Sequence, residues 1–374
     1  MKLGLIFTLG VSLETWHRQG LLDREKLLYE KLVKTPEVDS IYWFTYGSQD
    51  KCYQGLVDNC IKIIPMPRLF NSRFGKLIYS FLIPILKFKL FKQLDIIKTN
   101  QLKGGWSAFI AAKLYRKKLL VRLGYVWSLD AKRSGYRGAV DRFSAITERL
   151  VFKYADAVLT ADNLQKEYIL RMYNIDEAKI FIIPNYIDTE TFKALGGISK
   201  FPDRVVCVGR ISEEKNLESL IIALGNSGYG IDIYGSGNSK QRLKRISEEH
   251  NTNVDFKGNV PNSELAKILN RYFLFVLLSF YEGMPKALLE AMSCGLTVLC
   301  SDIDGINAII EHNHNGWLLK RNKDTRVIKD NIDILMKDKQ LMKRLGASAR
   351  EYAQGNFSIN KIVRKELEIY KNFY

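Results

Sequence analysis

Four charged residues in this chain of 374 residues have types and spacings that suit chemistry on a nucleotide. Glu282 and Glu290 are eight residues apart, and Arg210 lies five residues before Lys215. A carboxylate accepts hydrogen bonds from both hydroxyls of a ribose, whereas arginine and lysine neutralise phosphates. Cations beside a diphosphate also stabilise the negative charge that grows when a sugar–phosphate bond breaks. Residues of these types could therefore bind the ribose and the diphosphate of a nucleotide.

The segment around the two glutamates predicts a strand, a turn, a helix and a second strand. Residues 272–278 form a continuous apolar run, as in a strand buried on both faces. Glu282 lies in the following turn, and a helix is predicted from Pro285 to a stop at Gly295, before a buried strand at 296–300. This order places a helix N-terminus, which favours phosphate, where open α/β sheets bind ligands. On spacing alone, an amphipathic helix with two solvated glutamates is an equal alternative.

Apolar segments along the whole chain predict two parallel sheets. The strand candidates are residues 3–8, 40–45, 60–64, 96–99, 119–121, 157–160 and 179–183 in the first half, and 204–208, 231–234, 254–257, 273–278 and 296–300 in the second. Helical patterns separate most of them, which is typical of doubly wound sheets. One helix is expected after the first strand and its loop, running to about Val33, with Leu21, Leu22, Leu28 and Leu32 as candidate core residues.

The local sequence also resembles a known family. Residues 282–295 (EGMPKALLEAMSCG) resemble the E-x7-E motif of retaining GT-B glycosyltransferases of family 4, the glycosyl transferases group 1. Further matching segments are 183–188 (IPNYID), 208–210 (VGR) with 215–216 (KN), 234–237 (YGSG), 256–260 (FKGNV) and 315–318 (NGWL). The match is specific from about residue 205 to residue 319 and looser in the N-terminal half.

The resemblance implies an α/β fold of the GT-B type, with two doubly wound, Rossmann-like domains facing a cleft. Residues 1–185 would form the acceptor domain, residues 186–356 the nucleotide-sugar domain, and residues 357–374 a C-terminal helix that packs back on the N-terminal domain. It also implies retention of anomeric configuration, with same-face attack and proton transfer to the leaving phosphate. Enzymes of this type need no metal ion or cofactor, and the nucleotide-sugar is a co-substrate.

The same resemblance implies roles for individual residues. Arg210, Lys215 and backbone N–H groups of residues 283–286 would meet the diphosphate. Glu290 would hold the ribose, and Glu282 the donor-sugar hydroxyls near the reacting carbon. Without the resemblance, a solvated charged loop is the alternative for the two cations. The expected catalytic residues are Glu282, Arg210 and Lys215, and the expected donor-binding residues are Gly209, Val260 (through backbone near the base), Gly283, Met284, Pro285, Lys286, Leu289 and Glu290.

The acceptor side is less clearly marked. Many family members carry a histidine in the N-terminal cleft, but residues 121–127 read VRLGYVW and contain none. An aromatic such as Trp127 can stack on a sugar, and packing beneath the sheet edge is an equal alternative. The acceptor-side candidates are Gly10, Ser12 and His17 from the first loop, with Arg122, Tyr125 and Trp127 from this segment.

Positive charge is concentrated in one part of the chain. The net charge is +17, and residues 66–137 hold 16 lysines and arginines against two acids, Asp95 and Asp130. Such a basic face attracts phosphates or anionic lipid. Residues 70–94 interleave aromatic residues with lysines, which indicates either an interfacial amphipathic element or an ordinary helix with a basic outer face. A basic face that only keeps the protein dispersed is a further alternative.

Several classes of protein and site are disfavoured. The five cysteines form no C-x-x-C pair, which favours reduced, structural cysteines and a cytosolic setting. No apolar run reaches about 20 residues and the apolar start is too short for a signal peptide, so neither a transmembrane helix nor a leader is expected. Asp302-Ile303-Asp304 looks like the metal-binding D-x-D of GT-A transferases, but its position after a late strand favours coincidence.

Together these observations predict a metal-independent, hexosyltransferase-type enzyme. It would move a sugar from a nucleotide-sugar to a saccharide or lipid-linked acceptor in bacterial-type cell-surface polysaccharide assembly. It would be cytoplasmic and peripheral at the inner face of an anionic membrane. The alternatives are a non-catalytic subunit that keeps the nucleotide site and, from the net charge, a nucleic-acid-binding protein. The chain shows no recognisable nucleic-acid module, so no nucleic-acid partner is expected.

Overall fold

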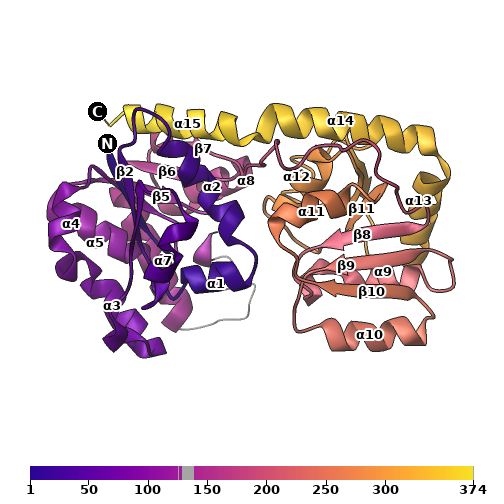
Figure 1. The fold of residues 1–374 in the computed structure, drawn as a ribbon, viewed down its shortest axis with the longest axis horizontal. Coiled ribbons are helices and arrows are strands. Elements are labelled where there is room, and N and C mark those ends of the chain that lie inside the picture. Colours follow the sequence, from indigo (N-terminus) through magenta and orange to yellow (C-terminus); the bar gives the residue numbers. More distant parts are fainter. Residues whose placement is uncertain (125, 129–138, 374) are drawn as a thin grey trace. The chain divides into compact units, whose positions relative to one another are not determined.

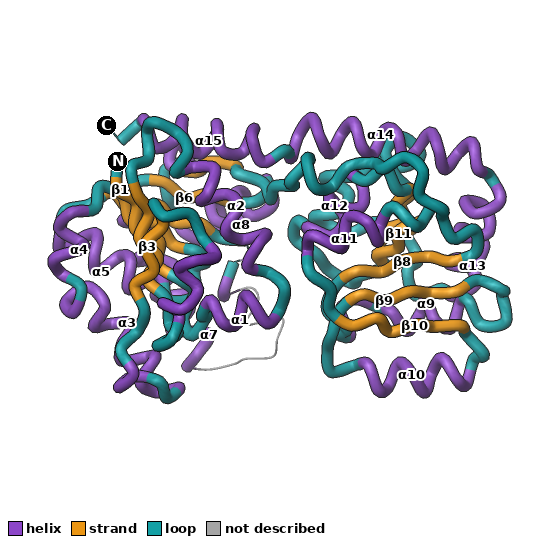
Figure 2. Tube along the Cα trace, viewed as in Figure 1, coloured by secondary structure: helices purple, strands orange, loops and turns teal. Residues whose placement is uncertain are grey.

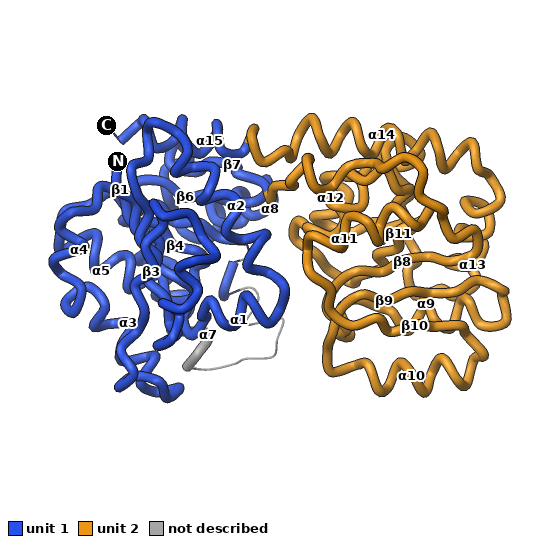
Figure 3. The backbone as a smooth tube through the Cα atoms, viewed as in Figure 1, with its two compact units in different colours: residues 1–184, 362–374 blue, residues 185–361 orange. Residues whose placement is uncertain are grey.

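The computed structural model describes all residues except 125, 129–138 and 374. The chain divides into two compact units, residues 1–184 with 362–374 and residues 185–361 (Figure 3). Both units contain a parallel sheet with helices (Figures 1 and 2), which confirms the doubly wound α/β fold expected from the sequence. Residues 362–374 belong to the first unit, and the unit boundary falls within the last helix, α15 (Ile359–Lys371).

The described part of the first unit has a seven-stranded parallel sheet in the order β3-β2-β1-β4-β5-β6-β7. Its strands are β1 (Lys2–Ile6), β2 (Ser40–Phe44), β3 (Ile61–Ile64), β4 (Ile96–Thr99), β5 (Lys118–Arg122), β6 (Ala157–Thr160) and β7 (Ile180–Ile182). Its helices are α1 (Leu13–Arg18), α2 (Leu22–Leu32), α3 (Arg73–Leu86), α4 (Phe88–Gln93), α5 (Gly105–Tyr115), α7 (Ala139–Tyr154) and α8 (Asn163–Tyr173), with short 3-10 helices η1 (Asp50–Leu56), η2 (Arg68–Phe70) and η3 (Glu177–Lys179).

The second unit has a six-stranded parallel sheet in the order β10-β9-β8-β11-β12-β13. Its strands are β8 (Arg204–Val208), β9 (Gly230–Tyr234), β10 (Asn253–Gly258), β11 (Leu274–Leu277), β12 (Thr297–Ser301) and β13 (Trp317–Leu319). Its helices are η4 (Glu213–Lys215), α9 (Leu217–Ala223), α10 (Lys240–Glu249), α11 (Asn262–Leu269), α12 (Lys286–Ser293), α13 (Thr325–Lys337) and α14 (Lys339–Phe357), and α15 (Ile359–Lys371) follows.

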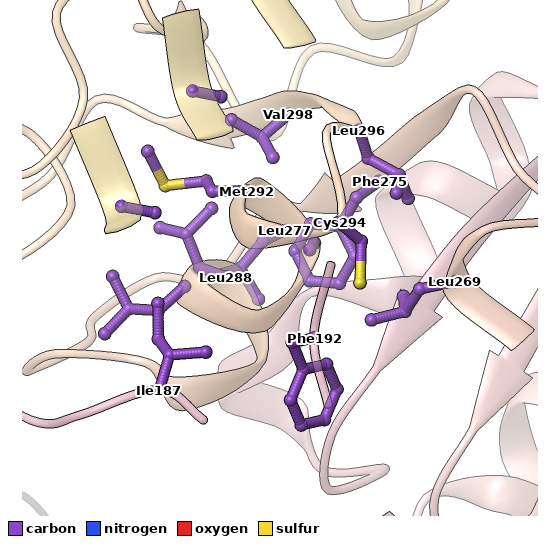
Figure 4. Close-up of a cluster of buried hydrophobic side chains, with 14 of the residues drawn as sticks. Ile187, Phe192, Leu269, Phe275, Leu277, Leu288, Met292, Cys294, Leu296 and Val298 are labelled. Carbon is purple, nitrogen blue, oxygen red and sulfur yellow. The ribbon is translucent and has the colours of Figure 1, made fainter. Parts of the chain in front are cut away.

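The second sheet is buried on both faces, which explains its continuous apolar strands. Along β11, Phe275 and Leu277 enter one hydrophobic cluster, whereas Leu274 and Val276 enter the cluster on the other side. Figure 4 shows side chains of β11, β12 and α12 meeting in the first cluster. The helix that carries Glu290 is therefore fixed against the sheet along its length.

Several local features of the structure differ from the sequence predictions. The helix expected up to Val33 is two helices, because the chain turns at Gly20, whose φ of 68° lies in the left-handed region. Leu22, Leu28 and Leu32 are buried as expected, whereas Leu21 is half-exposed at the start of α2. Helix α12 begins one residue later than predicted, because Pro285 is its N-cap and not its first residue. The short edge strand β13 was not predicted.

Helix α3 continues through Pro84, which has no N–H to donate to the carbonyl oxygen of Ser80. The hydroxyl of Ser107 on α5 donates to that oxygen instead. The indole N–H of Trp106 donates to the Ser80 hydroxyl at 2.9 Å, and the Tyr115 hydroxyl donates to the Pro84 carbonyl at 2.9 Å. Three α5 side chains thus compensate for the proline and fix α3 against α5.

Buried charges hold α15 within the first unit. Glu366 of α15 and Lys98 of β4 form an ion pair of 2.5 Å, and both side chains are 0% exposed. The Tyr370 hydroxyl donates to Glu366 at 2.6 Å, and the Arg122 guanidinium donates to its other oxygen at 3.3 Å. Burial raises the pKa of the Glu366 carboxyl, but the cations of Lys98 and Arg122 outweigh it, so this pKa lies below its usual value.

Candidate functional site

Loops from adjacent strands meet at the carboxyl edge of the second sheet. The Gly209 N–H after β8 donates to the Tyr234 carbonyl at 2.9 Å, and the Gly235 N–H after β9 donates to the Gly258 carbonyl at 2.8 Å. A side chain at Gly235 would place its Cβ 1.8 Å from the Gly209 carbonyl oxygen, so this approach requires glycine. The loop after β8 is therefore fixed by its neighbours.

Lys215 and Glu282 come together at this edge of the sheet. The Lys215 ammonium lies 2.5 Å from Glu282 Oε1, although the residues are 67 positions apart. The Ser279 hydroxyl donates to the same oxygen at 2.7 Å. The two side chains are 20% and 10% exposed, so the pair is largely covered but remains partly accessible to solvent. In this position, the lysine can exchange the carboxylate for a phosphate, and the carboxylate can exchange the lysine for sugar hydroxyls.

A network of amide side chains supports this pair. The Asn322 side-chain amide donates to the Ser279 carbonyl at 3.1 Å and to the Ser301 hydroxyl at 2.8 Å. Asn216, which follows Lys215 with a φ of 50°, donates to the Asn322 carbonyl at 2.6 Å. The Phe280 N–H donates to the Glu214 carbonyl at 2.8 Å. The loops that carry Lys215 and Glu282 are thus tied to each other and to a third loop.

The start of α12 lies at the same edge of the sheet, directly after the Glu282 turn. The Asn185 side-chain amide donates to the Met284 carbonyl at 2.7 Å, and the Asn185 N–H contacts the Met284 sulfur at 3.2 Å. A side chain at Gly305, after β12, would meet the Gly283 carbonyl oxygen at 2.2 Å, so glycine permits this contact. The first N–H groups of a helix have no partner within it, which suits this turn for a phosphate.

The remaining cations are placed differently. The Arg210 side chain is 75% exposed and lies 3.7 Å from Glu214. Arg210 nevertheless lines the same pocket as Gly209, Lys215 and Asn216. The Lys286 ammonium, in the first turn of α12, lies 5.0 Å from the ring centre of Tyr186. Arg210 is therefore the exposed cation of this pocket, whereas Lys215 is the one held in place.

The other donor-side residues lie deeper. Glu290 is 3% exposed and Leu289 is fully buried on α12, so the Leu289 side chain belongs to the core. Val260 follows β10 and packs against the same core cluster as Met284. Pro285 has no backbone N–H, so among residues 283–286 it cannot donate a hydrogen bond to a phosphate. The ribose role of Glu290 and the base contact near Val260 stay predictions.

Among the acceptor-side candidates, Arg122 donates to Glu366 and Trp127 is 8% exposed, with its ring 6.1 Å from Trp106 and 6.2 Å from Phe143. This geometry favours the packing alternative for Trp127. Tyr125 lies outside the described residues.

In the loop after β1, Gly10 has a φ of 80° and open space where a Cβ would lie. Ser12 caps α1 by accepting from the Thr15 N–H at 3.1 Å. His17 is exposed beside Tyr53, with ring centres 5.4 Å apart. The acceptor roles of all these residues stay predictions.

Sequence reasoning did not single out Asn185 or Asn322. Asn185 lies within the IPNYID segment that carries the resemblance, so the segment was found but the contact was not. Asn322 has no such signal, because the groups that accept from its side chain lie 21 to 44 residues earlier in the chain and Asn216 lies 106 residues earlier. Only the fold brings them together.

Cysteine burial agrees with a structural role for three of the five thiols. Cys207, Cys294 and Cys300 are buried, and burial raises the pKa of Cys207 and of Cys294 to about 12.

Within the described residues, no three His, Cys, Asp or Glu side chains are grouped as metal ligands, and no helix has the length and apolar character needed to cross a bilayer.

Comparison with known proteins agrees with the fold. Residues 188–352 match the family model described as Glycosyl transferases group 1, and residues 38–191 match that of Glycosyltransferase Family 4. The chain is similar to an uncharacterized glycosyltransferase of Methanocaldococcus jannaschii, with 25% identity over 86% of this chain and 84% of that protein. It is also similar to the Escherichia coli UDP-Gal:alpha-D-GlcNAc-diphosphoundecaprenol alpha-1,3-galactosyltransferase, with 24% identity over 77% and 78% of the two chains.

The fold has solved counterparts. The crystal structure of Anabaena HepE in complex with UDP-glucose superposes with a TM-score of 0.78 at 16% identity, covering 100% of both chains. The fold and its loop cluster define a GT-B glycosyltransferase. The two family matches together extend from residue 38 to residue 352, and the chain belongs to the family 4 glycosyltransferases, group 1.

Proposed function

We propose that this glycosyltransferase transfers a hexosyl group from a nucleotide-sugar to a saccharide or lipid-linked acceptor, with retention of configuration and without a metal ion. The observation that carries the proposal is the solvent-open Lys215–Glu282 pair beside the start of α12. It places a cation, a carboxylate and helix N–H groups at one sheet edge, which are the groups that a diphosphate and a sugar need.

In this proposal, Lys215 and Arg210 bind the diphosphate oxygens while the first turn of α12 faces the same group. Glu282 accepts hydrogen bonds from donor-sugar hydroxyls. The bond between the anomeric carbon and the phosphate oxygen breaks, and the acceptor oxygen bonds to that carbon on the same face. The acceptor proton passes to the leaving phosphate. Because charge grows on the diphosphate during this step, a preorganised lysine stabilises the transition state more than the ground state.

Relatives support a diphosphate-linked donor and a lipid-linked acceptor. The E. coli relative is named for transfer from UDP-Gal to a GlcNAc-diphosphoundecaprenol, and HepE was solved with UDP-glucose. The basic segment of residues 66–137 lies in the first unit and suits an acceptor that carries phosphate or lies at an anionic surface. We therefore propose a role in cell-surface polysaccharide assembly at the inner face of the membrane.

Thermal unfolding with UDP-, GDP- and ADP-sugars, each with and without EDTA, tests the proposal. A bound donor at a hundredfold excess over its dissociation constant stabilises the fold by about 2.7 kcal/mol. We expect one nucleotide class to raise the melting temperature and EDTA to leave both binding and transfer unchanged. Absence of any shift would contradict the donor assignment. Binding without transfer to any lipid-linked or saccharide acceptor would favour the non-catalytic alternative, and loss of transfer that Mg²⁺ restores would contradict metal independence.

A further inference from the structure

Helix α3 presents an apolar stripe to solvent, the reverse of an ordinary surface helix. Phe74, Leu77, Ile78, Phe81 and Ile85 are between 36% and 71% exposed and recur at the spacing of one helical face. The opposite face, with Gly75, Tyr79, Ser80 and Ile83, is buried. Of the two alternatives for residues 70–94, the exposed apolar stripe favours the interfacial amphipathic element over an ordinary helix with a basic outer face.

Helix α7 repeats this pattern. Phe143, Ile146, Leu150 and Tyr154 are between 39% and 59% exposed and again lie on one helical face. The buried residues of α7, among them Ser144, Glu148 and Val151, lie on other faces of the helix. Sequence reasoning missed this second stripe because an amphipathic pattern does not reveal which of its faces is covered.

A chain of aromatic contacts joins the two stripes across α5. The Phe81 ring stacks at 5.5 Å on Trp106 of α5, and Trp106 contacts Phe143 of α7 at 5.2 Å. Nearer the other end of α7, Phe109 of α5 stacks at 5.3 Å on Tyr154. Because α5 contacts both helices, the stripes belong to one surface, which we call the α3–α7 face.

Exposed basic side chains lie on the helices that form this face and on the neighbouring helix α4. The exposed ones on the described parts of α3, α4, α5 and α7 are Arg73, Lys89, Lys92, Lys113, Arg142, Arg149 and Lys153. Two of them lie over Tyr154 of the α7 stripe, Lys113 at 3.9 Å and Lys153 at 5.6 Å from the centre of its ring. An apolar surface with a cationic border is complementary to a bilayer with anionic headgroups.

We infer that the α3–α7 face inserts into the headgroup region of an anionic lipid bilayer, with both apolar stripes in contact with acyl chains and the surrounding cations on lipid phosphates. This inference deepens the proposed function, since it supplies the surface through which the enzyme would reach a lipid-linked acceptor. It also predicts two separable contributions to binding. The cations give a salt-sensitive attraction, whereas the stripes give one that persists when salt screens the charges.

Flotation with phosphatidylcholine vesicles and with vesicles that contain phosphatidylglycerol, at low and high salt, tests this inference. The wild type should bind the anionic vesicles at low salt and keep part of that binding at high salt. The pairs Phe74→Glu/Ile85→Glu and Ile146→Glu/Leu150→Glu should each lower partitioning at least about tenfold and remove the salt-resistant part. Lys89→Glu/Lys92→Glu should lower only the salt-sensitive part.

Two matched controls lie in the second unit. Ile334→Glu changes an isoleucine that is 50% exposed, close to the 59% of Ile85, and Lys343→Glu reverses an exposed lysine. Both should bind as the wild type does, and circular dichroism should show every variant folded.

The inference is overturned if the wild type binds neither vesicle or if the folded stripe variants bind unchanged. It is also overturned if the stripes instead mediate a concentration-dependent dimer that Phe74→Glu abolishes. Flotation needs no donor or turnover, so its outcome is independent of the transferase assignment.

Discussion

The two units each contain a lysine–glutamate pair at 2.5 Å, and the two pairs have opposite environments. Lys98 and Glu366 are 0% exposed and share their site with Tyr370 and Arg122. Lys215 and Glu282 are 20% and 10% exposed and line loops at a sheet edge. The same chemistry therefore fixes a helix in one unit and stays accessible to a ligand in the other.

The comparison shows why burial decides what an ion pair can do. A sealed pair is one that is fully buried and no longer hydrated, so removal of one partner leaves an uncompensated charge in the interior. An open pair can exchange its partner for a ligand or for water, so its loss affects binding more than folding. Ion pairs with the same N–O distance thus stabilise the fold of the first unit and form a candidate reaction site in the second.

The largest expected effect is on folding. Glu366→Ala leaves Lys98 and Arg122 without their shared carboxylate and should destabilise the first unit by about 3–5 kcal/mol. Denaturant unfolding, followed by fluorescence, measures this change. Glu282→Ala is the matched control in the open pair and should change stability by no more than about 1 kcal/mol. Equal losses in the two variants would contradict the distinction between the pairs.

The sealed pair also predicts an acid dependence. The pKa of Glu366 is lower in the folded protein than in the unfolded chain, because Lys98 and Arg122 outweigh its burial. Its stabilisation is therefore fully present above the ordinary carboxyl value of 4.5 and is lost as pH falls through the lower folded value. Glu366→Gln should remove this part of the acid dependence, as pH-dependent unfolding measures.

The next effect is on turnover. Lys215→Ala should lower kcat by about 10²–10³, the range for loss of one preorganised donor, with the fold intact. Steady-state kinetics with the donor found by thermal shift measures it, and Lys215→Arg should restore part of the rate because it keeps the charge. Normal turnover in Lys215→Ala would remove this residue from the mechanism.

A smaller effect concerns nucleotide affinity. If Glu290 accepts hydrogen bonds from the ribose, Glu290→Ala should weaken nucleotide binding by about 1.5–3 kcal/mol, as for a hydrogen bond to a charged group. Calorimetric titration of the nucleoside diphosphate measures the change, with melting temperature as the folding control. An unchanged dissociation constant would leave Glu290 as a core residue of α12, which its 3% exposure already makes a real alternative.

The smallest effect should come from the supporting network. Asn322→Ala removes the donor to Ser279 and Ser301 and loosens the loops that hold Lys215 and Glu282. We expect kcat to fall about tenfold while KM changes little, since a small displacement of a catalytic group weakens transition-state contacts. Asn307→Ala, on the exposed part of the loop after β12, is the control. A change confined to KM would contradict a positioning role.

Most strands and the helix after the Glu282 turn were predictable because their signals are local. The apolar runs predicted both ends of β4, β6 and β8 correctly. The E-x7-E segment predicted the start of α12 to within one residue. The three-residue strand β13 was missed because so short a run has no periodicity to recognise. The turn at Gly20 depends on a left-handed backbone conformation that hydrophobic spacing does not report.

Contacts between distant segments were the other limit. Lys98 and Glu366 are 268 residues apart, so no spacing rule pairs them. Arg122 was a reasonable acceptor-side candidate from its place after a strand, and only the fold shows that it contacts α15. The α3–α7 face is similar, because the sequence gives the amphipathic pattern and packing decides which side remains exposed.

Hydrogen–deuterium exchange with and without the nucleotide-sugar tests the central claim most directly, because it maps the donor onto the chain. The account predicts slower exchange in two segments, residues 209–216 and residues 282–290, which carry Lys215 and Glu282. It predicts no change around Lys98 and α15, where the sealed pair lies. Protection confined to the first unit, or saturating donor with no protection in either segment, would contradict the assignment of the open pair as the donor site.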